Sequence, residues 1–183
     1  MMAGNARTSY SGAAKFLHWT MALIILGMIP AGFLMAKVLA DGPVKDQLYA
    51  NHEALGFIVL VLASIRIAVK FASGSPPPAA SLTRFERIAS VSAHHLLYIL
   101  VVALPLVGWA ALSAYGLKIS MFGLFEIPAL LPKSEAWHER LFALHRAGGI
   151  LITGILLAHI GGGLMHLLVK RDGVFQRMWP GKV

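Results

Sequence analysis

The chain has 183 residues, of which 57 % are hydrophobic and 13 % are charged, and its mean hydropathy is +0.71. Soluble domains carry roughly 25 % charged residues, so this composition excludes an ordinary soluble protein and indicates one membrane-embedded domain over 1–183. The absence of cysteine excludes disulfides, iron–sulfur clusters and covalently attached c-type haem. The net charge of +8 comes from basic residues that flank apolar runs, which favours membrane orientation over a nucleic-acid partner.

Four apolar runs reach or approach the ~20 residues that cross a bilayer. They cover about 16–36, 54–72, 89–114 and 141–169, and they predict an all-α, integral membrane four-helix bundle. The first run is too long for a signal peptide and lacks a convincing cleavage site, so we expect it to remain in the mature protein. Pro76, Pro77 and Pro78 predict a stiff connection after the second run. The connection over 113–140 is expected to carry a short surface helix.

Basic residues are distributed unequally between the two ends of these runs. On one side, ten basic residues accompany only Glu86 and Asp172; they are Arg7, Lys15, Arg66, Lys70, Arg84, Arg87, Lys170, Arg171, Arg177 and Lys182. The other side has six residues of each sign: Lys37, Lys45, Lys118, Lys133, Arg140 and Arg146 against Asp41, Asp46, Glu53, Glu126, Glu135 and Glu139. Because cytoplasmic segments are enriched in lysine and arginine, the pattern predicts that both termini are cytoplasmic.

Four of the eight histidines have a spacing that suggests metal ligation. His145 and His159 are 14 residues apart. This is about 40° short of four helical turns, so they share one face with a rise of roughly 21 Å between them. Each needs a partner from another helix at the same depth. His18 matches His159 near the cytoplasmic side, and His52 matches His145 near the outer side. The spacing predicts two haems stacked across the bilayer, each with two histidine ligands and no open coordination position, which suits electron transfer.

The other histidines have competing interpretations, because a single membrane histidine is as readily a hydrogen-bonding residue as a metal ligand. For His94 and His95 we expect a structural hydrogen bond, or one to a haem propionate, rather than ligation. His138 is expected to be a loop residue before the membrane. His166 either contacts a propionate or a quinone, or lies in the interface.

Other residues near the predicted haems also have two interpretations. Trp19 is an interface anchor or part of a cofactor site, and Gly56 is the glycine best placed to make room for a haem. Arg146 follows His145 and either binds a propionate or anionic substrate, or extends to the interface. Basic residues at the inner side either neutralise propionates or, as we favour, set topology; they are Arg66, Lys70, Arg84 and Arg87.

These elements resemble the bacterial cytochrome b561 family, the small di-haem cytochromes b of the inner membrane. The resemblance covers nearly the whole chain. It rests on Phe16-Leu17-His18-Trp19, Asn51-His52-Glu53-Ala54-Leu55-Gly56, Arg66, His94 with Tyr98, Leu104-Pro105-Leu106-Val107-Gly108-Trp109, His145, His159, His166, Lys170-Arg171-Asp172-Gly173 and Arg177-Met178-Trp179-Pro180-Gly181. The resemblance implies that His18, His52, His145 and His159 bind haem b, in agreement with their spacing.

One departure from the family makes His138 a competitor of His145. The family's helix-four histidine is often followed by Glu, and here Glu139 follows His138 whereas Arg146 follows His145. Ligation by His138 would put the two ligands of this helix roughly 31 Å apart, which is too long for a bilayer core of about 30 Å. We therefore favour His145.

The resemblance further implies a function in transmembrane electron transfer. Some members are similar to superoxide oxidase, so the chain is expected to be a superoxide:ubiquinone oxidoreductase. Trp19 and His166 would then lie at the ubiquinone site, and four outer basic residues would steer superoxide: Lys118, Lys133, Arg140 and Arg146. One alternative is a cytochrome b subunit that exchanges electrons between quinone and a periplasmic redox protein. Another is a histidine-rich metal-ion carrier, against which the scarcity of membrane Asp and Glu argues.

Overall fold

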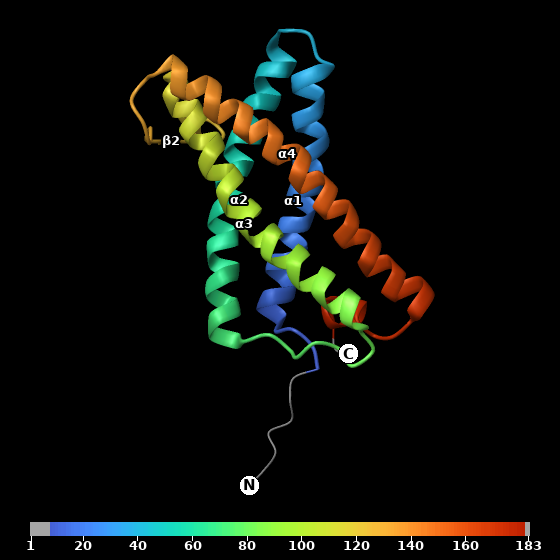
Figure 1. The fold of residues 1–183 in the computed structure, drawn as a ribbon. Helices are drawn as coiled ribbons and strands as arrows, with labels where there is room; N and C mark the ends of the chain where they lie inside the picture. Colours follow the sequence, from blue (N-terminus) through green and yellow to red (C-terminus); the bar gives the residue numbers. More distant parts are fainter. Residues whose placement is uncertain (1–7, 182–183) are drawn as a thin grey trace.

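Four long helices dominate the fold (Figure 1), which a computed structural model describes for residues 8–181. They are α1 (Gly12–Lys37), α2 (Pro43–Ser73), α3 (Arg84–Tyr115) and α4 (Glu135–Leu164). A π-helix, η1 (Met165–Lys170), continues α4, and a 3-10 turn, η2 (Phe175–Arg177), follows. By length and composition, all four long helices can cross a membrane. The predicted all-α membrane bundle is confirmed, while Arg7 and Lys182 of the charge pattern lie outside the described residues.

The helix boundaries follow local capping chemistry. Thr83 and Glu86 form a capping box at the start of α3, and Ser134 caps α4 through the backbone N–H of Trp137. Pro43 occupies the first turn of α2, where its missing N–H leaves no hydrogen bond unmade. For this reason α2 begins well before the apolar run predicted from about 54, and His52 lies inside the helix rather than near its start.

The connection between α3 and α4 forms a small hairpin, so the short surface helix expected there is wrong. Strands β1 (Ile119–Ser120) and β2 (Glu126–Ile127) pair antiparallel. Phe122 and Gly123 both have positive φ, which builds a tight turn and interrupts any helix. The hairpin buries Ile119 and Met121 in a cluster with Ala54 of α2. This burial fixes the connection at the end of the bundle opposite the described termini (Figure 1), which is called the outer end after the predicted orientation.

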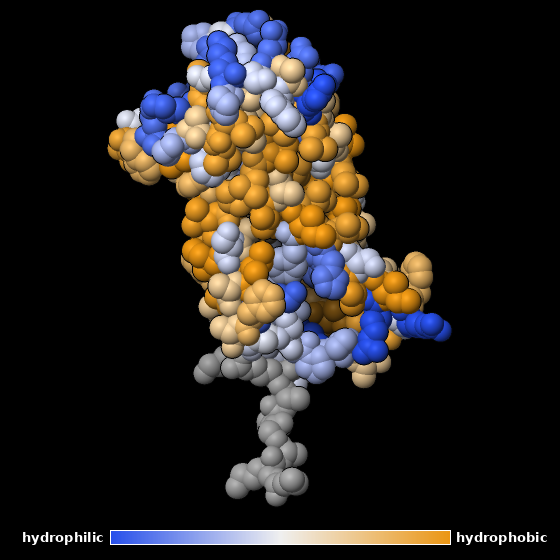
Figure 2. Space-filling model, turned by 60° about the vertical axis from the view of Figure 1, so that its left-hand side comes forward, coloured by the Kyte–Doolittle hydropathy of each residue, from blue (hydrophilic) through white to orange (hydrophobic). Residues whose placement is uncertain are grey.

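The helices pack mainly in chain order. Substantial packing joins α1 to α2, α2 to α3 and α3 to α4, whereas α4 makes few direct contacts with α1 or α2. Met21, Val59 and Ala63 form one buried core cluster, among the first three helices. The two described ends meet where the Tyr10 N–H donates to the Arg177 carbonyl at 3.1 Å. An apolar band separates two more hydrophilic ends (Figure 2), as expected of a protein embedded in lipid.

Candidate haem-binding site

The histidine pair nearer the α3–α4 hairpin, called the outer pair after the orientation predicted from the sequence, joins α2 to α4. The ring centroids of His52 and His145 are 6.2 Å apart, and the ring planes are nearly perpendicular, at 83°. The Nδ1 of His145 pairs with the Leu104 carbonyl at 3.0 Å. Because a carbonyl only accepts, Nδ1 must carry the proton, which leaves Nε2 free to bind a metal. The Nδ1 of His52 is buried without a hydrogen bond of ordinary geometry, although the Met28 backbone lies close to the ring.

The inner pair joins α1 to α4 in the same way. His18 and His159 have ring centroids 6.1 Å apart and an interplanar angle of 74°. The ring of His94 on α3 is 5.1 Å from that of His159, and its Nδ1 donates to the Ser90 carbonyl at 2.6 Å. His94 therefore makes the structural hydrogen bond expected from the sequence, and His95 is exposed.

Both pairs have a spacing that fits an iron ion between the rings. Metal–imidazole bonds are about 2.0–2.1 Å long, so two imidazoles on opposite sides of one metal have centroids about 6.4 Å apart. The observed 6.1 and 6.2 Å lie within a few tenths of this distance. The 5.1 Å between His94 and His159 is too short for an intervening iron. The rings of His18, His52, His145 and His159 are only half-buried although they point into the bundle, which fits a flat ligand beside them.

Glycines on α1 and α3 allow the outer histidines to approach closely. A Cβ at Gly108 would lie 3.0 Å from Nδ1 and Cε1 of His145, and one at Gly32 would lie 3.5 Å from Cε1 of His52. At Gly56 a Cβ would instead contact Met28, at 3.7 Å. Among the described residues, the glycines lying against candidate ligand rings are thus Gly32 and Gly108, which the sequence pattern does not distinguish from the others.

His138 is a helical residue packed against α3, so its expected place in a loop is wrong. It lies in the second turn of α4 because Ser134 starts that helix ahead of the apolar run. Its Nδ1 donates to the Ala111 carbonyl at 2.9 Å, and its ring packs against Tyr115 and Phe142. These contacts hold it away from His52, and the structure places His145 opposite His52 instead.

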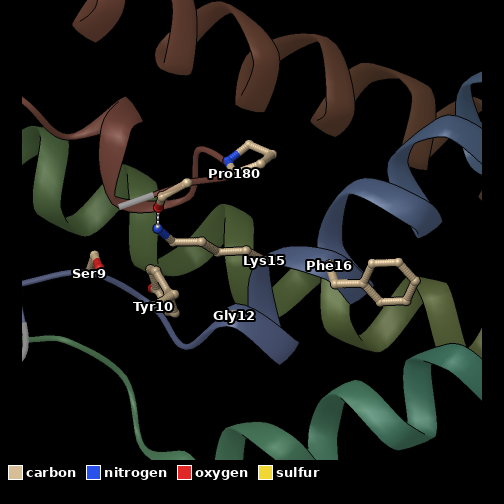
Figure 3. A pocket seen from close by; sticks show the side chains of 7 residues that line it. Ser9, Tyr10, Gly12, Lys15, Phe16 and Pro180 are labelled. Atoms are coloured by element: carbon tan, nitrogen blue, oxygen red, sulfur yellow. Dashed lines mark hydrogen bonds between the residues drawn. The ribbon is translucent and has the colours of Figure 1, made fainter. Parts of the chain in front are cut away.

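At the inner end, the C-terminal segment closes over the start of α1. The indole N–H of Trp19 donates to the Met178 carbonyl at 2.9 Å, and its ring packs against Phe175 and Trp179. The buried ammonium of Lys15 donates to the Gly181 carbonyl beside a cavity of about 600 Å³ (Figure 3). Trp19 is thus a packed contact between α1 and the tail, adjacent to the candidate ligand His18.

His166 forms a buried pair that the sequence did not predict. Its Nδ1 lies 2.9 Å from Oδ2 of Asp172, and both side chains are about nine-tenths buried. The Val174 N–H also donates to Asp172, at 3.3 Å. Burial raises the pKa of Asp172, but hydrogen bonds from His166, Ser81 and Val174 outweigh it and hold the pKa below its usual value. Because η1 is a π-helix, the α-helical phase that relates His145 to His159 does not extend to His166.

The outer basic residues differ in how they are paired. Lys118 forms an exposed ion pair with Glu126 at 2.8 Å, and this hydrogen bond raises the pKa of Lys118. Lys133 lies against Gly116, at the end of α3. Arg140 and Arg146 are exposed on α4 and make no ion pair within residues 8–181. Arg146 is the nearest of the four in sequence to a ligand histidine.

Comparisons with known proteins identify the family of this chain. A family model described as prokaryotic cytochrome b561 matches residues 9–181. Cytochrome b561 homolog 2 of Escherichia coli (strain K12) is 27 % identical over 95 % of this chain and 93 % of its own length. Cytochrome b561 homolog 1 of the same strain is 25 % identical over 93 % and 97 %. A probable superoxide oxidase, CybB, of Yersinia pestis is 25 % identical over 94 % and 97 %. This chain belongs to the prokaryotic cytochrome b561 family and is a bacterial multi-pass membrane cytochrome that binds haem b and transfers electrons.

Proposed function

We propose that the chain holds two b-type haems and carries electrons from superoxide at the periplasmic face to ubiquinone near the cytoplasmic face. The observation that carries this proposal is the presence of two histidine pairs with metal-bridging separations, 6.1 and 6.2 Å. The two α4 ligands are 14 residues apart, a rise of roughly 21 Å. Haem supplies one-electron chemistry at both depths when bound. The termini are proposed to be cytoplasmic, on the side with the greater excess of basic residues.

The proposed reaction balances as two superoxide anions plus ubiquinone and two protons giving two dioxygen molecules and ubiquinol. Superoxide loses one electron per molecule, and the quinone gains two electrons and both protons. The unpaired guanidinium groups of Arg140 and Arg146 attract a small anion toward the outer end. The similarity to the probable superoxide oxidase of Yersinia pestis supports this donor.

The inner end offers groups suited to a quinone and to proton delivery. Asp172 fixes Nδ1 of His166. In the imidazolium form both ring nitrogens carry protons, so Nε2 can donate to a quinone oxygen and pass its proton to it. Trp19 contributes an aromatic wall next to His18. A metal-ion carrier has no comparable support, because no group of three or more potential metal ligands occurs within residues 8–181.

Haem content tests the first half of the proposal. Purified protein should contain two haems per chain, with low-spin b-type spectra on reduction by dithionite. His52→Leu and His145→Leu should each lose the outer haem, and His18→Leu and His159→Leu the inner one. His95→Leu is the matched control, because His95 is exposed and should leave both haems in place. One haem per chain, or loss of the same haem in all four variants, would contradict the pairing.

Pulsed superoxide tests the donor. In protein with both haems and bound ubiquinone, superoxide should reduce the haems faster than it dismutates spontaneously. Reduction by ubiquinol but not by superoxide would refute the donor and favour a soluble periplasmic partner. Copurification of such a redox protein would then identify the chain as a cytochrome b subunit.

A further inference from the structure

Two cations on α2 lie side by side near the inner histidines. The guanidinium of Arg66 is 5.9 Å from the ring centroid of Tyr98 on α3, and the ammonium of Lys70 is 4.5 Å from the same centroid. Arg66 also donates to the Ala14 carbonyl of α1 at 2.6 Å. Both side chains are half-buried. The last two turns of α2 thus turn two positive charges toward the neighbouring helices instead of extending both into the interface.

This cationic pair has no anionic partner in the part of the chain that the structure describes. The ion pairs among residues 8–181 involve other residues, and the contacts of Arg66 and Lys70 are with a carbonyl oxygen and an aromatic ring. Charged groups held within a membrane protein are costly unless they are paired, and a cation over a tyrosine ring gains only part of that stabilisation. Two adjacent uncompensated cations therefore indicate a missing anion.

The position of the pair identifies the anion. Arg66 lies within electrostatic reach of His18 and His159, the two proposed inner ligands, and both cations lie within reach of His94. Figure 2 shows hydrophilic side chains around a hollow in the lower half of an otherwise apolar flank, toward the end that carries the chain termini. Haem b brings two propionate carboxylates, which match two cations in number and sign. We propose that Arg66 and Lys70 bind the propionates of the haem held by His18 and His159.

For these two residues, propionate binding is thus preferred to the topology signal that was favoured from the sequence. Arg84 and Arg87 stand in the first turn of α3 and are exposed, and their side chains make no hydrogen bond, ion pair or cation–π contact within residues 8–181. Exposed positive charges of this kind at a helix end are typical of a signal that sets membrane orientation. Arg66 and Lys70 instead converge on one tyrosine ring, and a guanidinium fork is suited to a carboxylate. The inference rests on the proposed inner haem, so that haem must be counted before the variants are compared.

The experiment uses the detergent-purified holoprotein and the variants Lys70→Gln and Arg66→Gln. Lys70→Gln removes a charge without breaking the Arg66 bond to Ala14, so it preserves the link between α1 and α2. Removing a cation disfavours the reduced haem, and we expect the reduction equilibrium of one haem to fall by about tenfold, or about 59 mV for one electron. The propionate-bending band in the resonance Raman spectrum should shift in the same variants. Arg66→Lys, which keeps the charge, should retain most of the potential.

Arg87→Gln is the matched control and should leave both the potentials and the Raman band unchanged. If Lys70→Gln and Arg66→Gln keep the wild-type propionate band, the assignment is overturned, even where a potential falls through space. A shift of the outer-haem potential alone would also overturn it. If the unmodified protein lacks the haem that His18→Leu removes, the proposed function itself fails, and that result is visible before any variant at 66 or 70 is made.

Discussion

Gly108→Ala should disturb the outer haem without touching a ligand. The Cβ that this substitution adds would lie 3.0 Å from Nδ1 and Cε1 of His145. Carbon atoms prefer separations of about 3.5–4.0 Å, so the ring must retreat by about 0.5 Å or the two helices must separate. The ring of His145 cannot retreat freely, because its Nδ1 donates to the carbonyl of Leu104, which lies one turn before Gly108 on α3.

The size of the effect follows from that hydrogen bond. Its length is 3.0 Å, and a retreat of about 0.5 Å would stretch it beyond the ordinary hydrogen-bond range. Loss of an outer-shell partner of a ligand histidine typically weakens metal binding by about 10- to 100-fold. This corresponds to about 1.4–2.8 kcal/mol. We expect Gly108→Ala to lose haem from the outer site, or to shift its midpoint potential, while the inner haem stays unchanged.

The assay is a haem count per chain by pyridine haemochrome, combined with a redox titration that resolves the two haems. Gly154→Ala in α4 is the matched control, because a Cβ there would meet no other atom within 4 Å. Alanine in a helix interior is more favourable than glycine by about 0.5–1 kcal/mol, so this control should be neutral or slightly stabilised. Two haems and wild-type potentials in Gly108→Ala would refute the reasoning.

Three further variants test the outer surface and the inner end. Arg146→Gln should slow haem reduction by superoxide several-fold at low salt and less at high salt. Lys118→Gln should have a smaller effect, because Lys118 is already paired with Glu126. Equal effects of the two variants in stopped-flow traces would exclude selective steering by Arg146. Hydrogen bonds hold the pKa of Asp172 below its usual value in the folded protein. The stabilisation of the fold by the Asp172 carboxylate is therefore present above the unfolded pKa of about 3.9, and it is lost as the pH falls through the folded-state pKa. In Asp172→Asn, the melting temperature followed by haem absorbance should therefore fall less steeply below about pH 4 than in the unmodified protein. An unchanged fall would contradict this role. Trp19→Phe removes one hydrogen bond to the Met178 carbonyl, a loss of about 0.5–1.5 kcal/mol. The C-terminal tail should then be cleaved roughly two- to tenfold faster in limited proteolysis. Phe16→Leu, at an exposed position of α1, should not change the cleavage rate.

Sequence reasoning was most successful where a long apolar run directly dictates a helix. The four runs all lie in helices, and Pro76–Pro78 separate α2 from α3 as predicted. It failed where short-range chemistry outweighs hydropathy. Pro43 starts α2 ahead of its apolar run, and two positive-φ residues make a hairpin where a surface helix was expected. The early start of α2 and the hairpin each depend on one or two residues, so a hydropathy pattern, which averages over many residues, does not reveal them.

The histidine pairs were predictable because a regular helix converts sequence spacing into position. Between His145 and His159 the chain is uninterrupted α-helix, so fourteen residues return the side chain to nearly the same face. The same argument does not reach His166, because the π-helix changes the phase. The Leu104 and Asp172 contacts are long-range or turn-dependent, and no sequence period reveals them.

The sparse contact between α4 and the first two helices gives the histidine pairs a structural role in the proposed holoprotein. Among the described helices α4 packs closely on α3, and its opposite face has few contacts with α1 and α2 at the depths of His145 and His159. Flat apolar macrocycles held by histidines from α1 and α2 would lie against that face and join α4 to the helices it barely touches. The ligands that hold the cofactors are then also the main link across the bundle, because each pair reaches from α4 to a different helix. In a bundle built in this way, haem binding would stabilise the arrangement of α4 beside α1 and α2, because a ligand that binds only the folded state stabilises that state.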